Sequence, residues 1–146
     1  MINTDPMAVR QEIEAIQPHL SLLKACGCKI MVFAETSGTV HGQRDVPVTK
    51  RPVLAESEWP IFVERLSELG EWMAAQGVSI AFHHHMGTVI EKASEIHRLM
   101  EGTPDSVGLL FDTGHLAFAG DRPAAVARKR ARRINHVVPG TSAPIL

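Results

Sequence analysis

Three short apolar runs divide the chain, and each of them ends in polar residues. They occupy residues 29–36, 78–88 and 107–115. Strands that are buried on both faces of a parallel sheet read as continuous hydrophobic runs, and α/β enzymes gather their chemistry where such strands end. We therefore predict strands over 29–34, from 78 into the following histidines, and over 107–112, with functional residues at their carboxyl ends.

Apolar residues that recur at three- and four-residue steps predict helices around these strands. The predicted helices cover residues 9–26, 57–76, 88–100 and 122–133. Gly27 and Gly77 end the first two, and Ser57 is a candidate cap for the second. Pro18 lies inside the first helix and is expected either to kink it or to split it in two. A fourth, partial strand is predicted over 134–138.

The predicted order is helix, strand, helix, strand, helix, strand, helix and partial strand. This alternation predicts an α/β fold with a parallel sheet and right-handed crossovers, either open and doubly wound or part of a (β/α)8 barrel. No glycine-rich phosphate motif follows any strand, which disfavours a nucleotide-binding sheet. A long polar stretch over 36–52 follows the first strand. Loops of this length are usually functional or disordered, and its position favours function.

Composition excludes several classes of protein. The 146 residues have the length of one domain, with a formal net charge of -1. No apolar stretch approaches the roughly 20 residues of a membrane span, and no basic and then apolar leader opens the chain. We therefore expect a cytoplasmic protein that binds neither membrane nor nucleic acid. One basic cluster, interpreted as a solvated helix face, comprises Arg128, Lys129, Arg130, Arg132 and Arg133.

The two cysteines, Cys26 and Cys28, are separated by one residue. In an extended segment their side chains would point to opposite faces, so a disulfide is disfavoured. Two cysteines are also too few for a zinc finger. We predict that one or both are small buried hydrophobic residues at a helix-to-strand junction.

Three consecutive histidines, His83, His84 and His85, follow the second apolar run. Side chains alternate along a strand, so His83 and His85 would point one way and His84 the other if the strand continues through them. Core packing explains a lone histidine more readily than three in a row at a strand end. We predict that at least one of them is functional.

Asp112 and His115 form an Asp-Thr-Gly-His strand end, in which a turn at Gly114 brings carboxylate and imidazole together. Both groups are common ligands for divalent transition metals. The alternative is that Asp112 caps the following turn. Glu35 occupies the equivalent end of the first strand, where it could bind a polyol hydroxyl, act as a base or merely be solvated.

Several segments of the chain together match a known family. They are residues 34–38, 41–42, 50–54, 83–88 and 109–120. Together they resemble the bacterial inosose dehydratases, which belong to the xylose isomerase-like TIM barrels. Asp-Thr-Gly-His is shared across that superfamily and indicates only the barrel, whereas three histidines followed by Met-Gly-Thr are far more specific. The resemblance implies a partial TIM barrel, about half of one, over 1–138.

The resemblance also implies a function. Inosose dehydratases are lyases of inositol catabolism that remove water from 2-keto-myo-inositol, a small polyol ketone, with Mn²⁺ or Co²⁺ as cofactor. A divalent ion would polarise the ketone, a base would take the neighbouring carbon-bound proton, and an acid would assist loss of the hydroxyl. The residues implied are Asp112 and His83 as metal ligands, His85 and His115 as catalytic acid or base, and Glu35 and His84 as substrate-binding residues. His83 departs from the superfamily pattern, in which many members have Glu.

The chain departs from the family at both ends. The family sequence begins with roughly two further βα units and continues through strands that supply another metal-binding Glu. Val138 stands where the family has a ligand histidine, and the tail 139–146 matches nothing in the family. These departures predict a frameshifted or truncated gene, with a designed fragment as the alternative.

Half a barrel would leave two edge strands unpaired and an apolar inner face uncovered. We therefore expect poor stability as a monomer, or a homodimer through these edges, together with weak metal binding. Two hypotheses follow: a dehydratase completed by another chain, or a non-catalytic barrel fragment that associates. A sugar isomerase or epimerase of the same superfamily is a third, which the Met-Gly-Thr context disfavours.

Overall fold

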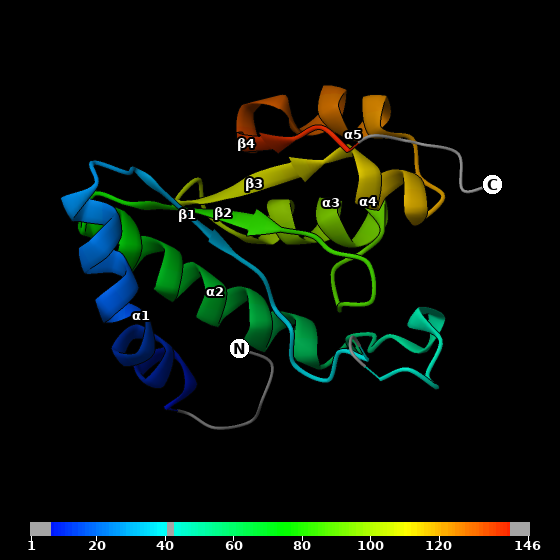
Figure 1. Cartoon of the computed structure of the whole chain (residues 1–146), viewed down its shortest axis with the longest axis horizontal. Coiled ribbons are helices and arrows are strands. Elements are labelled where there is room, and N and C mark those ends of the chain that lie inside the picture. The colour runs from blue at the N-terminus through cyan, green and yellow to red at the C-terminus, as the bar shows by residue number, and fades with distance from the viewer. Residues whose placement is uncertain (1–6, 41–42, 141–146) are drawn as a thin grey trace.

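Four parallel strands form one sheet in the computed structural model, which describes residues 7–40 and 43–140 (Figure 1). The strands are β1 (Ile30–Phe33), β2 (Ser79–His83), β3 (Val107–Asp112) and β4 (Ile134–Val138). The helices are α1 (Ala8–Ala25), α2 (Glu58–Ala75), α3 (Ala93–Gly102), α4 (Thr113–Phe118) and α5 (Pro123–Arg130), with short 3₁₀ turns at η1 (Val48–Lys50) and η2 (Ala131–Arg133).

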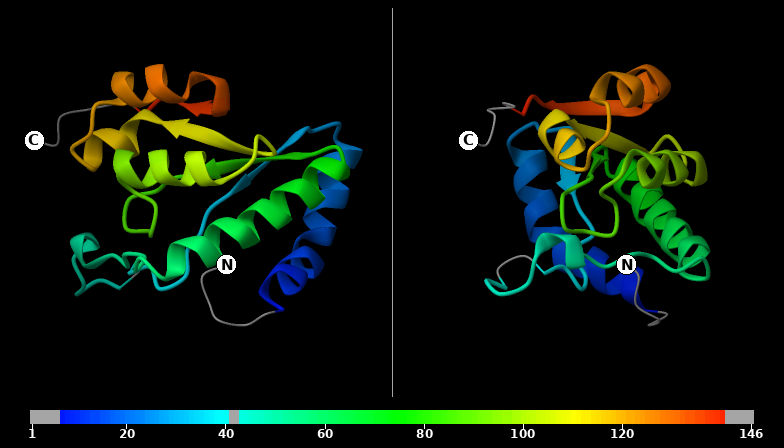
Figure 2. Two further views of the ribbon diagram at one scale, coloured as in Figure 1. Left: turned by 180° about the vertical axis from the view of Figure 1, so that it is seen from behind. Right: turned by 90° about the vertical axis from the view of Figure 1, so that its right-hand side faces the viewer.

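The strand order in the sheet is the order along the chain. Each of the four strands pairs in parallel with the next one, from β1 to β4. A doubly wound sheet reverses its strand order at a switch point, whereas successive strands of a (β/α)8 barrel are always neighbours. The predicted alternation of helix and strand is confirmed, and the described sheet is ordered like part of a barrel. The two views of Figure 2 show α1 packed with α2 beside β1, and α5 beside β4 at the other edge.

Helices cover one face of the sheet. Side chains that alternate along the strands, such as Met31, Phe82 and Leu109, pack with buried helix residues such as Phe62 and Ile96 in one hydrophobic core. Burial of this apolar surface is the main force that holds the layers together. The intervening strand positions point to the opposite face, which corresponds to the lumen of a barrel.

The lumen side of the sheet carries the polar strand ends. Val32, which is 51% exposed, lies on this side because it alternates with the buried Met31. The register pairs Val32 with Ala81, and His83 with Leu110. Since side chains two residues apart share a face, His83 and Asp112 also point to the lumen side.

A bulge in β4 places a side chain that forms a hydrogen bond across β3 to β2. The register between β3 and β4 shifts at Leu109 and Leu110, and Asn135 is the extra residue. Its Nδ2 donates a hydrogen bond to the carbonyl oxygen of Ile80, 2.9 Å away on β2. The Asn135 amide lies so close to Gly108 that a Cβ there would overlap it, which explains the glycine in mid-strand.

The first and third helices differ in detail from the prediction. α1 runs unbroken through Pro18, so the alternative of a split helix is wrong. Its buried residues Val9 and Leu20 lie on either side of the proline, and their packing holds both halves. α3 begins at Ala93 and not at residue 88, because the residues before it form a loop. The cause of that delay is a carboxylate network described below.

Two further expectations are wrong. Cys26 and Cys28 are exposed and not buried, and they flank the turn at Gly27, whose φ of 72° suits glycine. The basic cluster is not simply a solvated face either, since the side chains of Arg130 and Arg133 are only 11% and 14% exposed. Both arginines bind the end of α3.

In the part of the chain that the structure describes, no helix combines the length and apolar character needed to cross a bilayer.

Candidate metal centre

Three side chains with metal-binding atoms converge at the carboxyl ends of β2 and β3. His83 is the last residue of β2, Asp112 is the last residue of β3, and His115 lies in the first turn of α4. Because β2 and β3 pair in parallel, their carboxyl ends meet at one edge of the sheet. Each of the three residues offers a ligand atom, and these atoms all lie within 4.8 Å of one another.

The spacing of these atoms suits a shared cation. Asp112 Oδ2 lies 3.5 Å from His83 Nε2 and 3.7 Å from His115 Nε2. Two ligands of a tetrahedral ion, each about 2.1 Å from it, stand about 3.4 Å apart. In the described residues, His83 Nε2 is buried without a hydrogen-bond partner. Buried polar atoms are almost always satisfied, so an orphaned imidazole nitrogen facing a carboxylate fits a divalent metal.

The two oxygens of Asp112 have different partners. Oδ1 accepts a hydrogen bond of 2.9 Å from the backbone N–H of His115 and so caps α4. Oδ2 faces the imidazoles of His83 and His115. The cap that was the alternative interpretation is therefore present at Oδ1. The interpretation of Asp112 as a metal ligand stays a prediction, now for Oδ2. The helix α4 was not predicted, because only a turn was expected after Asp112.

The protonation states favour metal binding at neutral pH. Burial raises the pKa of the Asp112 carboxyl, but the His115 N–H and the neighbouring imidazoles outweigh it, and the pKa lies below its ordinary value. Burial and the nearby His85 lower the pKa of His83, against the opposing effect of Asp112. The carboxylate is thus charged and the His83 imidazole neutral, which are the forms that ligate a cation.

His84 contacts the backbone of one member of this group, Asp112. Its ring is completely buried, and Nε2 accepts a hydrogen bond of 3.2 Å from the backbone N–H of Asp112. Burial lowers the pKa of His84 to about 4, so the ring is neutral and can accept this hydrogen bond. The predicted contact of His84 with substrate stays a prediction, and the ring has no exposed surface in this chain. Its hydrogen bond ties the end of β3, where Asp112 lies, to the residue after β2.

His85 lies beside His115 at the mouth of the centre. The two ring centroids are 3.9 Å apart, and His85 Nδ1 is 2.8 Å from the carbonyl oxygen of Met86. The structure therefore brings together the two histidines that were predicted as acid and base. It also places His115 in the metal-ligating group, because a helical turn carries residue 115 back over its cap.

Glu35 lies at the end of β1 and is buried, with 5% of its surface exposed. Its Oε1 accepts a hydrogen bond of 2.9 Å from the backbone N–H of Ser37. The alternative of a solvated Glu35 is therefore wrong. Among the described residues, the candidate metal-ligating group does not include it. His41, which belongs to the matching segment 41–42 between β1 and α2, lies outside the described residues.

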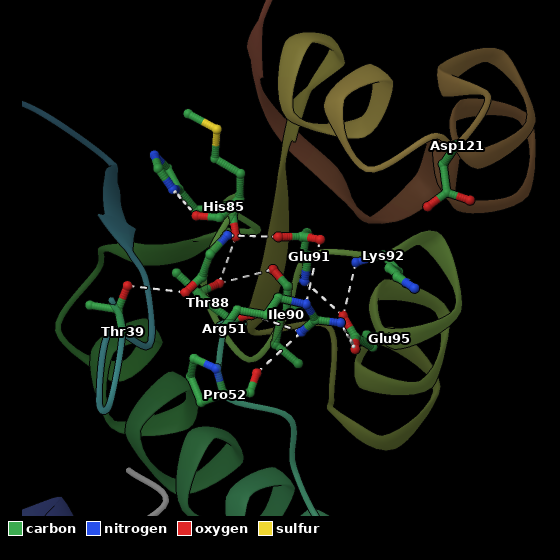
Figure 3. A network of polar contacts seen from close by, with 12 residues as sticks. Thr39, Arg51, Pro52, His85, Thr88, Ile90, Glu91, Lys92, Glu95 and Asp121 are labelled. Carbon is green, nitrogen blue, oxygen red and sulfur yellow. Dashed lines mark hydrogen bonds and ion pairs between the residues drawn. The ribbon is translucent and has the colours of Figure 1, made fainter. Parts of the chain in front are cut away.

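A second polar group next to this centre was not predicted. Arg51, Glu91 and Glu95 form a buried ion cluster beside the loop that begins at His85 (Figure 3). Glu91 and Glu95 lie within the helix predicted over 88–100, where solvated carboxylates are ordinary. The one residue in the sequence that could have indicated this cluster is Arg51, in the long polar stretch over 36–52. Its partners lie about forty positions further along the chain.

Comparison with known proteins agrees with this architecture. Residues 1–139 match the family of xylose isomerase-like TIM barrels. The chain belongs to this family. The predicted fold class, a partial barrel of this type, is confirmed by that match and by the sheet.

Curated proteins with similar sequences make the resemblance more specific than the superfamily. The rhizopine catabolism protein MocC of Rhizobium meliloti is 48% identical over 129 residues, which cover 88% of this chain and 40% of that protein. An inosose dehydratase of Geobacillus thermodenitrificans is 43% identical over 126 residues, or 85% of this chain and 42% of that protein. The resemblance to inosose dehydratases is confirmed, and the chain spans less than half the length of these relatives.

Solved structures share the fold. The probable 3-DHS dehydratase AsbF of Bacillus anthracis superposes with a TM-score of 0.72 at 15% identity, covering 93% of this chain and 46% of that one. The IOLI protein, solved with a bound zinc atom, gives a TM-score of 0.67 at 20% identity, covering 90% of this chain and 45% of that one. At these identities the likeness extends to the fold alone.

Proposed function

We propose that this chain carries the metal-dependent dehydration site of an inosose dehydratase, acting on 2-keto-myo-inositol with Mn²⁺ or Co²⁺. The observation that carries the proposal is the group of His83, Asp112 and His115, whose ligand atoms lie within 4.8 Å of one another at the strand ends. Relatives named inosose dehydratase at 38% to 43% identity support the substrate. The zinc of the IOLI protein supports a divalent ion.

In this proposal His83, Asp112 and His115 hold the ion, and His84 keeps Asp112 oriented. When bound, a divalent ion would supply Lewis-acid polarisation of the substrate ketone. His85 takes the proton from the carbon next to the ketone and returns it to the departing hydroxyl group. One C–H bond and one C–O bond break, a C=C bond forms, and water leaves. His115, which was also predicted as acid or base, is assigned first to the ion because of its distance to Asp112.

Glu35 is proposed to accept a hydrogen bond from a hydroxyl of the polyol ring. It is buried at the end of β1, two strands away from Asp112 in the sheet order. The carboxyl ends of neighbouring parallel strands share one edge, so a six-membered ring can span them. A buried carboxylate that faces a hydroxyl gives specificity for a polyol over an apolar ketone.

We further propose that a second copy of this chain completes the site. Within the described residues, β1 and β4 are the outer strands of the sheet, and Val32 and Val137 are 51% and 54% exposed. Unpaired parallel edges favour association. The competing proposal is a barrel fragment that associates without catalysis. The cytoplasmic location remains a prediction.

The test is an assay of the purified chain with 2-keto-myo-inositol, with and without Mn²⁺ or Co²⁺. Loss of water from the substrate is followed by mass spectrometry, and light scattering gives the oligomeric state. His85→Ala should abolish turnover, while His19→Ala, at an exposed position on α1, should retain it. Absence of turnover in a folded dimer with bound metal would reject the dehydratase proposal for this chain and favour the non-catalytic fragment.

A further inference from the structure

The segment over 84–91, here called the histidine loop, is closed on itself by hydrogen bonds. The backbone N–H of His85 donates to the carbonyl oxygen of Ile90 at 3.0 Å, and Thr88 Oγ1 donates to the carbonyl oxygen of His85 at 2.8 Å. Glu91 Oε2 accepts a hydrogen bond of 2.7 Å from the N–H of Gly87, whose φ is 77°. The loop is thus a compact unit that carries His85 at one end and Glu91 at the other (Figure 3).

Arg51 reaches this loop from a distant part of the sequence. Its side chain is only 8% exposed, and Nη1 donates a hydrogen bond of 2.9 Å to the carbonyl oxygen of Thr88. Nη2 donates to Glu95 Oε1 at 2.6 Å, and Nε lies 3.4 Å from Glu91 Oε1. One guanidinium therefore joins the backbone of the histidine loop to two carboxylates.

Those two carboxylates define where the loop stops and α3 starts. Glu95 Oε2 accepts hydrogen bonds from the N–H groups of Glu91 and Lys92, at 2.8 Å and 2.9 Å. These contacts satisfy donors at the start of the helix, which delays α3 to Ala93. Without a cation between them, Glu91 and Glu95 would repel each other in a poorly solvated place. Arg51 removes that repulsion and sets their spacing.

The connection between β1 and α2 contacts the histidine loop at a second point. Thr39 Oγ1 donates a hydrogen bond of 3.0 Å to the carbonyl oxygen of Gly87. Thr39 and Arg51 both belong to the long polar stretch over 36–52, which was predicted to be functional. The stretch holds the histidine loop at two of its carbonyl groups, those of Gly87 and Thr88.

We propose that Arg51 is a positioning residue that fixes His85 beside His115 by anchoring the histidine loop. This proposal rests on the proposed dehydratase function, in which His85 moves the proton. Arg51 contacts the loop and α3, whereas the ligand group lies on β2, β3 and α4. Loss of the anchor should therefore misplace His85 and leave metal binding intact. The planar fork of arginine makes several directed bonds that the point charge of lysine does not.

The first test compares Arg51→Lys with Arg98→Lys. Arg98 also joins α3 to the connection before α2, through Glu56 at 2.7 Å and 2.8 Å, and among the described residues its hydrogen bonds go to Glu56 and not to the histidine loop. Hydrogen exchange is measured at the amides of His85 and Gly87 and, as a reference, at Leu109 in β3. Arg51→Lys should lower protection of the two loop amides by about tenfold with Leu109 unchanged. Arg98→Lys should alter none of the three.

The second readout concerns turnover and metal binding. Arg51→Lys should lower kcat by about tenfold, because a small misplacement of a reacting group is costly. The Kd for Mn²⁺ should stay within about threefold of the wild-type value, since no ligand has moved. Equal loss of protection at Leu109 and in the loop, or unchanged loop amides, would overturn the proposal.

Failure of this proposal and failure of the proposed function can be told apart. Hydrogen exchange and metal titration need no turnover, so they decide whether Arg51 anchors the loop even if the chain removes no water from the substrate. Where Arg51→Lys does not fold, Glu95→Gln replaces it. That change removes the charge opposite Nη2 and keeps an acceptor for the α3 cap. Unchanged loop protection in Glu95→Gln would likewise reject the anchor.

Discussion

Two polar clusters stand at opposite ends of β3, and they differ in what their polar atoms contact. At the amino end, the two Nη atoms of Arg133 donate to the backbone carbonyls of four residues, Met100, Thr103, Pro104 and Val107. At the carboxyl end, Asp112 Oδ2 faces two imidazoles at 3.5 Å and 3.7 Å, beyond ordinary hydrogen-bond distances.

The difference separates a structural cluster from a candidate functional one. Arg133 closes the turn between α3 and β3, because its Nη atoms donate directly to those carbonyls. The carboxyl end instead presents an anionic oxygen and the orphaned His83 Nε2 toward one another. In (β/α) barrels the amino end of the strands supplies stability and the carboxyl end supplies chemistry. We propose the same division for this chain.

The largest expected effect is at the structural end. Arg133→Met should lower the free energy of unfolding by about 3 kcal/mol or more, because it leaves several buried carbonyls without a donor. Urea denaturation measures the change, with Arg132→Met, at an exposed position, as the matched control. The control should change stability by no more than about 0.5 kcal/mol. Equal effects of the two substitutions would show that the Arg133 contacts contribute nothing.

The pH dependence of stability tests the other end. The pKa of His84 falls from an ordinary 6.5 to about 4 on folding, chiefly through burial. The unfolded chain therefore binds more protons in this interval, so the free energy of unfolding falls as the pH is lowered from 6.5 to about 4. The loss should reach about 3 kcal/mol, and His83, whose pKa is also lowered, adds in the same sense.

Urea denaturation in the presence of a chelator, between pH 7 and pH 4, measures this dependence. His84→Gln retains an acceptor for the Asp112 N–H but does not titrate in this range, so its stability should vary much less with pH. A wild-type protein as stable at pH 4.5 as at pH 7 would contradict the buried, neutral state of His84.

The fold was predictable because the two central strands, β2 and β3, are buried over nearly all of their length. Their runs are mainly apolar and end in a polar residue, His83 or Asp112, so both strands and strand ends were found from local sequence. α4 was missed because four residues of Asp-Thr-Gly-His show no helical period. The start of α3 was misplaced because Glu91 and Glu95 act through contacts with Arg51, about forty residues away.

The site was predictable only in its residue types. His83, Asp112 and His115 were all singled out, but whether His115 binds an ion or moves a proton depends on how α4 folds back over Asp112. Substrate contact by His84 stays a prediction, and the complete burial of its ring could not be predicted because alternation along the strand says nothing about what covers each face. Its hydrogen bond to the Asp112 backbone depends on the pairing of β2 with β3, which is a tertiary fact.

The most direct measurement is a calorimetric titration of the chain with Mn²⁺ or Co²⁺, for wild type, Asp112→Asn and Asp105→Asn. Asp105 is 98% exposed in its side chain and serves as the matched control. We expect micromolar binding by wild type and Asp105→Asn, and a loss of about 100-fold in Asp112→Asn, since a central anionic ligand is removed. Absence of binding by a folded wild-type chain, or equal binding by all three, would contradict a metal centre at the ends of β2 and β3.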